Sequence, residues 1–276
     1  MSLTVGTGPF GEQPAARFNI DVDRSAPLLI WDPVPQRVRA LIREETVVDS
    51  SGVVLLHETG SLPIYYFPEE DVRADLLEPS DRKEHSPHKG EARYWSVRVG
   101  DRVAPDAVWA YPHPVESASF LAGYVALDWS SFDEWFVEDE QAFGHPRDPY
   151  SRIDVYATTR HVRVLLHGEV LADSRRTKVL FEAALPPRYY FPSEDVRTDL
   201  LVPSSTKSRC AYKGSASYWH VRVGERRVED LVWTYADPQH DAERVRDMLC
   251  FFNERVDLEL DGTVGDRPRT QYSREE

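Results

Sequence analysis

Two copies of one segment make up most of the chain, and this repeat limits the folds available to it. The block YYFPEEDVRADLLEPS, which begins at Tyr65, returns as YYFPSEDVRTDLLVPS from Tyr189, a shift of 124 residues. The block KGEARYWSVRVG returns downstream as KGSASYWHVRVG in the same register. Residues 38–139 align with 162–263 without a gap, and roughly a third or more of the paired positions are identical. Two copies are too few for a solenoid, so we expect each copy to fold as a domain of its own.

The repeat predicts where the domains begin and end. The first domain covers residues 38–140, with residues 1–37 as an N-terminal extension that joins it, and the second covers 152–263, followed by a tail at 264–276. The intervening segment 141–151, QAFGHPRDPYS, contains Gly, two prolines and little apolar content, which is typical of a linker. We expect the same strand order in both copies and packing about an approximate two-fold axis, as in an internal pseudo-dimer.

Composition and charge exclude several classes of protein. The chain is 41% hydrophobic and 29% charged, and it has no apolar run near the roughly 18 residues that span a bilayer, so we expect a soluble protein with no membrane partner. The N-terminus, MSLTVGTGPFGEQ, lacks the basic start and apolar stretch of a secretory signal, which predicts a cytoplasmic location. A net charge of −14 repels phosphate backbones, so duplex nucleic acid is not an expected partner.

The cysteines and the strand pattern indicate how the fold is held together. Cys210 and Cys250 are the only cysteines, too few for a disulfide framework or a structural zinc site, and no structural zinc is expected. In the segment 92–99, Trp95 and Val97 alternate with polar and aromatic neighbours that point the other way, which is typical of a half-buried strand. The pattern recurs in the second copy. The predicted class is mainly β.

Two further local patterns predict short elements in each copy. One or two short helices are expected in each copy. The first follows Pro68 and Pro192, because proline suits a first helical position and the acidic residues that follow suit the helix dipole. The second is expected at about 116–123 and 242–247. Each copy is then expected to close with a hairpin. In the second copy its strands would be 248–252 and 256–260, joined by a turn at 253–255.

The motifs in their fixed order resemble the bacterial family called domain of unknown function 427. The resemblance rests on YYFP-x-EDVR-x-DLL-x-PS, on K-G-x-A-x-YW-x-V-x-V-G and on VW-x-Y-x-DP, and it covers most of each copy. It implies a compact β-tent-like fold, similar to methionine sulfoxide reductase B and without its metal. A nucleotidyltransferase-like label accompanies the family, but the Gly-rich turn and paired acidic residues that hold magnesium in such enzymes are not found in the sequence.

The central turn departs from the family pattern in one copy. The family favours C-P-Y-K-G, and the second copy reads CAYKG, with Cys210 first, whereas the first copy reads SPHKG, with Ser86 in its place. The resemblance therefore predicts that the second copy holds the competent site. A thiol beside Arg209 and Lys213 would be favoured as a thiolate, which makes Cys210 the candidate nucleophile. The alternative is a small buried residue, and the only nearby base, His220, has no counterpart in the first copy.

The predicted helix offers a second set of polar groups. It would place Asp71 and Asp75 on one face at i,i+4, with Arg73 between them. Such carboxylates either hold a metal, act in acid/base chemistry, or form salt bridges, for instance from Glu69 to Arg73. The second copy repeats the arrangement with Asp195, Arg197 and Asp199.

We predict a small-molecule binding module whose pocket combines the Lys-Gly turn, the aromatic strands and the Arg/Asp helix, with anionic or nucleotide-like compounds as candidate ligands and no identified cofactor. The turn lysine either contacts the ligand or extends into solvent. The alternative function is an enzyme, either thiol-dependent through Cys210 or nucleotidyltransferase-like. The pocket residues predicted in the second copy are Arg197, Asp199, Cys210, Lys213, Gly214, Tyr218, Trp219, Trp233 and Tyr235. Their first-copy counterparts are Arg73, Asp75, Lys89, Gly90, Tyr94, Trp95, Trp109 and Tyr111.

Overall fold

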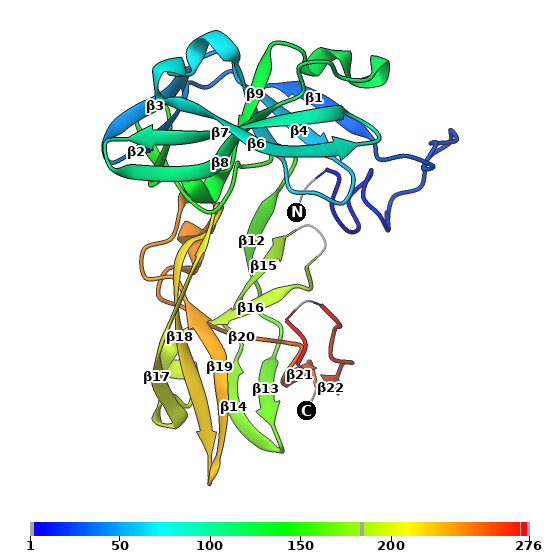
Figure 1. The fold of residues 1–276 in the computed structure, drawn as a ribbon. Helices are drawn as coiled ribbons and strands as arrows, with labels where there is room; N and C mark the ends of the chain where they lie inside the picture. Colours follow the sequence, from blue (N-terminus) through cyan, green and yellow to red (C-terminus); the bar gives the residue numbers. More distant parts are fainter. Residues whose placement is uncertain (1–2, 183–184, 271, 275–276) are drawn as a thin grey trace. The chain divides into compact units, whose positions relative to one another are not determined.

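The chain folds into two units that each contain one copy of the repeat. The computed structural model describes residues 3–182, 185–270 and 272–274. One unit ends at Tyr150 and the other begins at Ser151; we call them the first and second domain and describe each by itself. Each contains one seven-stranded and one four-stranded antiparallel sheet (Figure 1). The mainly β prediction is confirmed.

The two domains have the same strand order, as the gap-free register predicts. The large sheet of the first domain runs β1 (Leu29–Pro33), β4 (Val54–Glu58), β5 (Ile64–Pro68), β9 (Tyr124–Leu127), β8 (Arg102–Ala110), β7 (Gly90–Val99), β6 (Leu77–Ser86), and its small sheet runs β11 (Glu140–Ala142), β10 (Glu134–Val137), β2 (Val38–Ile42), β3 (Glu45–Ser50). The large sheet of the second domain runs β12 (Ile153–Ala157), β15 (Lys178–Glu182), β16 (Arg188–Phe191), β20 (Leu249–Phe251), β19 (Arg226–Thr234), β18 (Gly214–Val223), β17 (Leu201–Cys210), and its small sheet runs β14 (Glu169–Ser174), β13 (Val162–Leu166), β21 (Asp257–Leu260), β22 (Thr263–Val264). The predicted two-fold packing of the copies stays a prediction.

The main core of each domain lies between its two sheets. In the first domain, Val38 and Ile42 of β2 pack against Phe67 of β5 and Val97 of β7. A second cluster, which includes Tyr66, Tyr94, Tyr111 and Leu121, forms on the other face of the large sheet. Neighbouring residues of one strand therefore enter different clusters, as the alternation in 92–99 predicts.

The helical segments of the described residues are all short 3₁₀ turns. They are η1 (Glu69–Asp71), η2 (Ala74–Leu76), η3 (Glu116–Leu121), η4 (Trp129–Ser131), η5 (Ser193–Asp195), η6 (Thr198–Leu200) and η7 (His240–Val245). Within the described ranges, no helix is long and apolar enough to cross a membrane.

The single helix predicted after Pro68 is wrong, because the chain forms two turns there instead. Val72 separates them in an extended conformation (φ −99°, ψ 136°), is buried and forms a β-bridge with Val48. This tertiary pairing prevents a continuous helix, so Asp71 and Asp75 do not share a face.

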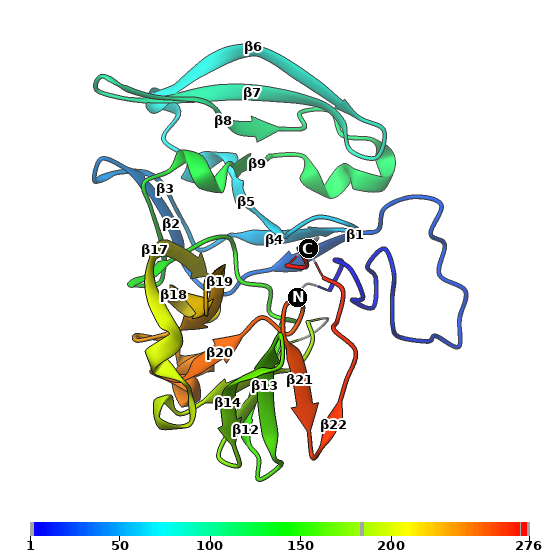
Figure 2. The same cartoon turned by 90° about the horizontal axis from the view of Figure 1, so that it is seen from below.

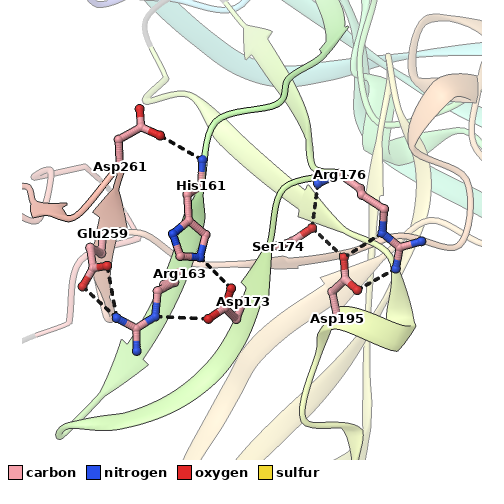
Figure 3. Close-up of polar contacts among 8 residues, drawn as sticks. All are labelled: His161, Arg163, Asp173, Ser174, Arg176, Asp195, Glu259 and Asp261. Atoms are coloured by element: carbon pink, nitrogen blue, oxygen red, sulfur yellow. Dashed lines mark hydrogen bonds and ion pairs between the residues drawn. The ribbon is translucent and has the colours of Figure 1, made fainter.

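Asp71 and its counterpart Asp195 instead join the first 3₁₀ turn to the small sheet. The hydroxyl of Ser174 donates to Asp195 Oδ2 at 2.6 Å, and Arg176 pairs with the same carboxylate at 2.6 Å (Figure 3). In the first domain, Ser50 donates to Asp71 at 2.5 Å. These carboxylates are structural partners of the sheet, not paired acids of one site.

The closing hairpin predicted for each copy is also wrong. In the second domain, β20 pairs with β16 and β19 in the large sheet, whereas β21 pairs with β13 and β22 in the small sheet (Figure 2). The connection 253–255 therefore crosses between sheets. It is fixed by two buried side chains: Asn253 donates to the carbonyl of Pro187 at 2.8 Å, and Glu254 binds Arg188.

Candidate functional site

The Lys-Gly turn joins β6 to β7 and packs closely against a following segment. Gly90 has a φ of +106°, and a Cβ there would lie 3.0 Å from the carbonyl oxygen of His113. The carbonyl of Lys89 accepts a hydrogen bond from Val115 N at 3.2 Å. The glycine is thus required both by its left-handed backbone and by this close approach. Gly214 has the same role in the second domain, with a φ of +89° and the carbonyl of Asp237 at 3.0 Å.

Each turn lysine forms an ion pair with a glutamate that motif comparison had not singled out. Lys89 Nζ contacts Glu58 at the end of β4, and their side chains are only 12% and 19% exposed. Lys213 contacts Glu182 in the same way, with exposures of 11% and 9%. Neither lysine extends freely into solvent. Because the pair is the same in both domains, it gives no reason to prefer the second.

Tyrosines line the sheet face beside this ion pair. In the first domain they are Tyr66, Tyr94 and Tyr111. Burial, supported by the charge of Glu58, raises the pKa of Tyr111 to about 12, and burial also raises the pKa values of Tyr66 and Tyr94. Their counterparts Tyr190, Tyr218 and Tyr235 are shifted in the same direction for the same reason. All six phenols therefore stay protonated at neutral pH and cannot act as bases.

The residues predicted to form one pocket separate into three places. Trp109, Tyr94 and Tyr111 share one face of the large sheet with the lysine turn, whereas Trp95 packs into the core on the opposite face. In the second domain, Tyr218, Trp233 and Tyr235 lie on one face and Trp219 on the other.

The arginine and aspartate of the 3₁₀ turns form the third group. Arg197 is exposed and pairs with Asp199 at 2.7 Å and with Glu169 at 3.2 Å. It precedes β17, and Lys213 follows the far end of that ten-residue strand, so roughly 30 Å separates them along the strand. In the first domain, Arg73 pairs in the same way with Asp75 and Glu45. Neither pair shares a pocket with the turn lysine.

The two cysteines have no catalytic partner of the predicted kind. Cys210 pairs with Gly214 and His220 pairs with Val202, so roughly 20 Å of strand separates thiol and imidazole. His220 Nδ1 instead contacts Glu229 at 2.5 Å. Cys250 is fully buried, and burial raises the pKa of its thiol, which fits its predicted place in the core. Among the described residues, no cluster of three His, Cys, Asp or Glu could hold a metal ion.

A cavity of about 460 Å³ opens in the first domain, with lining residues from both hydrophobic clusters. Its walls include three tryptophans. The rings of Trp129 and Trp135 are parallel and 4.4 Å apart, and Trp135 Nε1 donates to the carbonyl of Trp129 at 3.0 Å. The third, Trp109, is the only predicted site residue among the walls. The lining residues are Ser61, Leu62, Pro63, Ile64, Tyr65, Trp109, Leu127, Asp128, Trp129, Ser130, Trp135, Gly144, His145 and Pro146. We call this cavity the tryptophan pocket.

Asp128 is the one carboxylate in the wall of the tryptophan pocket. Its Oδ2 accepts hydrogen bonds from the hydroxyls of Ser130 at 2.7 Å and Ser131 at 2.6 Å, which fix the orientation of the side chain. An adjoining cavity of about 270 Å³ shares Asp128 and Trp109 with it and adds Arg82 and Asp106. Trp109 therefore forms a wall of both cavities.

Comparison with known families agrees with the motifs. The family described as domain of unknown function (DUF427) matches residues 31–138 and 154–262. The chain belongs to this family. The two matches confirm the predicted tandem arrangement of two DUF427 domains, whereas the likeness to methionine sulfoxide reductase B stays a prediction. A search of curated proteins finds no match.

The two DUF427 domains differ at the tryptophan pocket. At the position of Ile64 the second domain has Arg188, at Asp128 it has Phe252, and at Ser130 it has Glu254. Arg188 and Glu254 form two hydrogen bonds of 2.7 Å, with side chains 5% and 0% exposed. The guanidinium lies 5.6 Å from the ring centre of Trp233 and 5.8 Å from that of Phe252. The space that is open in the first domain is therefore filled by an ion pair in the second.

The C-terminal tail covers this ion pair. Thr270 donates to Glu254 at 2.6 Å, and Tyr272 packs on Phe252 with ring centres 5.4 Å apart. Burial alone would lower the pKa of Arg188 and raise that of Glu254, but the hydrogen bonds between them outweigh burial, so the pKa of the guanidinium is raised and that of the carboxyl is lowered. Both groups therefore stay charged at neutral pH.

Proposed function

We propose that this protein is a small-molecule binding module and that its binding site is the tryptophan pocket of the first domain. One observation carries the proposal: the same place in the repeated fold is open in the first domain and filled by Arg188 and Glu254 in the second. The family pattern around Cys210 favoured the second domain. The geometry favours the first, because the Lys–Glu pair is common to both and the open aromatic cavity is not.

The dimensions and chemistry of the pocket support binding of a small organic molecule. Ligand sites have volumes of roughly 300–1,000 Å³, walls that are mostly apolar and a few fixed polar groups, and the cavity of about 460 Å³ meets all three conditions. Its tryptophans offer large, rigid apolar surfaces. Asp128 supplies an oriented charge.

Binding without catalysis is supported over the enzymatic alternative. Cys210 and His220 are too far apart to act together. The ammonium of Lys213 already pairs with Glu182, and the buried phenols stay protonated. None of these groups is arranged as the base that a thiol nucleophile requires.

A thermal-shift screen of a small-molecule library tests the proposal. A compound present at 100 times its Kd stabilises the folded state by about 2.7 kcal/mol, which raises the melting temperature of a domain of this size by several degrees. The decisive variant is Ile64→Arg/Ser130→Glu, which installs the ion pair of the second domain in the tryptophan pocket. Hits should stabilise the wild type and not this variant.

The mirror variant Arg188→Ile/Glu254→Ser serves as the matched control, since it leaves the first domain unchanged and should respond to hits at least as strongly as the wild type does. The proposal fails if the filled variant is stabilised as much as the wild type. It also fails if the hits lose their effect only when the second domain is altered.

A further inference from the structure

We propose that the tryptophan pocket recognises a planar organic cation, such as a guanidinium, an amidinium or a protonated nitrogen heterocycle. The inference rests on the proposed function, because it names the class of ligand for that same site. It replaces the anionic ligand that the turn lysine had suggested from sequence.

The second domain shows what the repeated fold places in the corresponding space. There the planar guanidinium of Arg188 lies beside the rings of Trp233 and Phe252 and forms a two-point contact with Glu254. Guanidinium groups favour this combination of an aromatic face and a carboxylate fork. In the second domain, the side chain of Arg188 thus occupies the position that a bound ligand would take.

The first domain keeps one of these two rings and has no arginine at the position of Arg188. Trp109 stands at the position of Trp233, Ile64 replaces the arginine, and Trp129 adds a further indole to the lining. A planar ligand that enters this space meets Trp109 where Arg188 meets the ring of Trp233, and it meets Asp128 where Arg188 meets the ring of Phe252. The vacated position therefore suits a planar group of similar size.

The charge of the lining selects a cation over an anion. No lysine or arginine lines the tryptophan pocket among the described residues, and Asp128 is its carboxylate. Asp128 lies two residues before Ser130, the counterpart of Glu254, so both domains supply a carboxylate from the same connection. In the adjoining cavity, Arg82 is engaged with Glu84 and lies over the ring of Tyr94. The net charge of −14 also attracts cations at long range.

Three probes of nearly the same shape and different charge test the inference: benzamidine (positive), benzamide (neutral) and benzoate (negative). Each is titrated calorimetrically into the full-length protein. Because a cation gains both the aromatic faces and a charge-assisted contact with Asp128, benzamidine should bind at least about tenfold more tightly than benzamide. Benzoate should show no measurable binding.

Asp128→Asn separates the charge from the shape of the site, because the amide oxygen still accepts from the serine hydroxyls. It should weaken benzamidine about tenfold and change benzamide less than about twofold. Asp106→Asn, in the adjoining cavity, is the matched control and should leave benzamidine binding nearly unchanged. The filled variant Ile64→Arg/Ser130→Glu provides a second, independent test and should abolish benzamidine binding.

The outcomes distinguish this inference from the proposed function. Equal affinity for benzamidine and benzamide, unchanged benzamidine binding in Asp128→Asn, or no binding of benzamidine to the wild type would each overturn the cationic class. The proposed function would still stand in these cases if the library hits lose their effect in the filled variant. Undiminished benzamidine binding in the filled variant would place the probe elsewhere and overturn the inference about this pocket.

Discussion

Removing Glu254 alone should strongly destabilise the second domain. Glu254→Ser leaves the guanidinium of Arg188, whose side chain is 5% exposed, without the carboxylate that binds it through two hydrogen bonds. Breaking a buried ion pair by removing one partner typically costs about 3–5 kcal/mol, because the remaining charge is buried and uncompensated. Only the second domain should lose folding stability.

Removing both partners should be far less harmful. Arg188→Ile/Glu254→Ser reproduces the pair Ile64 and Ser130, which the first domain already accommodates in the same fold. Removing both partners leaves no buried charge uncompensated, and what remains is the loss of packing because Ile and Ser are smaller than Arg and Glu. We therefore expect the free energy of unfolding of the double variant to lie within about 1.5 kcal/mol of the wild type, and the two substitutions to be strongly non-additive.

Hydrogen exchange measured by mass spectrometry on the full-length protein can read out each domain separately. Since 1.4 kcal/mol corresponds to a tenfold change, a cost of about 3–5 kcal/mol means that Glu254→Ser should speed exchange of the most protected β16 amides by about 10²- to 4 × 10³-fold. The most protected β5 amides serve as an internal reference. Equal destabilisation by the single and double variants would refute the reasoning, because it would mean that the pair does not act as a unit.

Three further predictions concern stability. Burial lowers the pKa of His57, so the unfolded chain binds the proton more readily than the folded one. The first domain should therefore lose stability as the pH falls below about 6.5. His57→Phe should remove this dependence of the melting temperature on pH. Gly90 has a φ of +106°, and an added Cβ would lie 3.0 Å from a backbone oxygen, so Gly90→Ala should lower the free energy of unfolding by about 2–3 kcal/mol in a denaturant titration. In the control Gly100→Ala the added Cβ meets nothing within 4 Å, and the loss should be about 1 kcal/mol. Equal losses would contradict the steric explanation. Lys89→Met and Lys213→Met should each destabilise their own domain by about 1–3 kcal/mol, because each leaves a largely buried carboxylate unpaired. Loss of stability in only one of the two variants would show that the two turns are not equivalent.

The agreement in strand order between the two copies was predictable from the repeat, whereas the predicted helix and closing hairpin were wrong. A gap-free register leaves no room for a different order of strands in the second copy, and the alternation around Trp95 assigns neighbouring side chains to opposite faces. The helix after Pro68 failed because Val72 pairs with Val48, a contact between distant parts of the chain that outweighs local preference. The hairpin failed in both copies because its two strands pair with strands distant in sequence and in different sheets, β20 with β16 and β19, and β21 with β13.

The site was harder to predict because its defining residues are those that differ between the copies. Motif comparison selects shared residues, and most of these proved to be core or turn residues, such as Trp95 and Gly90. The pairing of Lys89 with Glu58 joins residues 31 positions apart, so no motif contains both. The replacement of Ile64 by Arg188 was visible in the sequence, but its meaning depends on knowing that position 254 lies beside it.

The central claim is that the first domain has an open aromatic site and the second has the same site filled. The indole ¹H–¹⁵N spectrum of the full-length protein tests it most directly, because the chain has seven tryptophans that can be assigned one by one by substitution. On addition of the strongest stabiliser from the library screen, the signals of Trp109 and Trp129 should shift, and those of Trp219 and Trp233 should not. A shift of Trp233 with Trp129 unchanged would contradict the claim and place the site in the second domain.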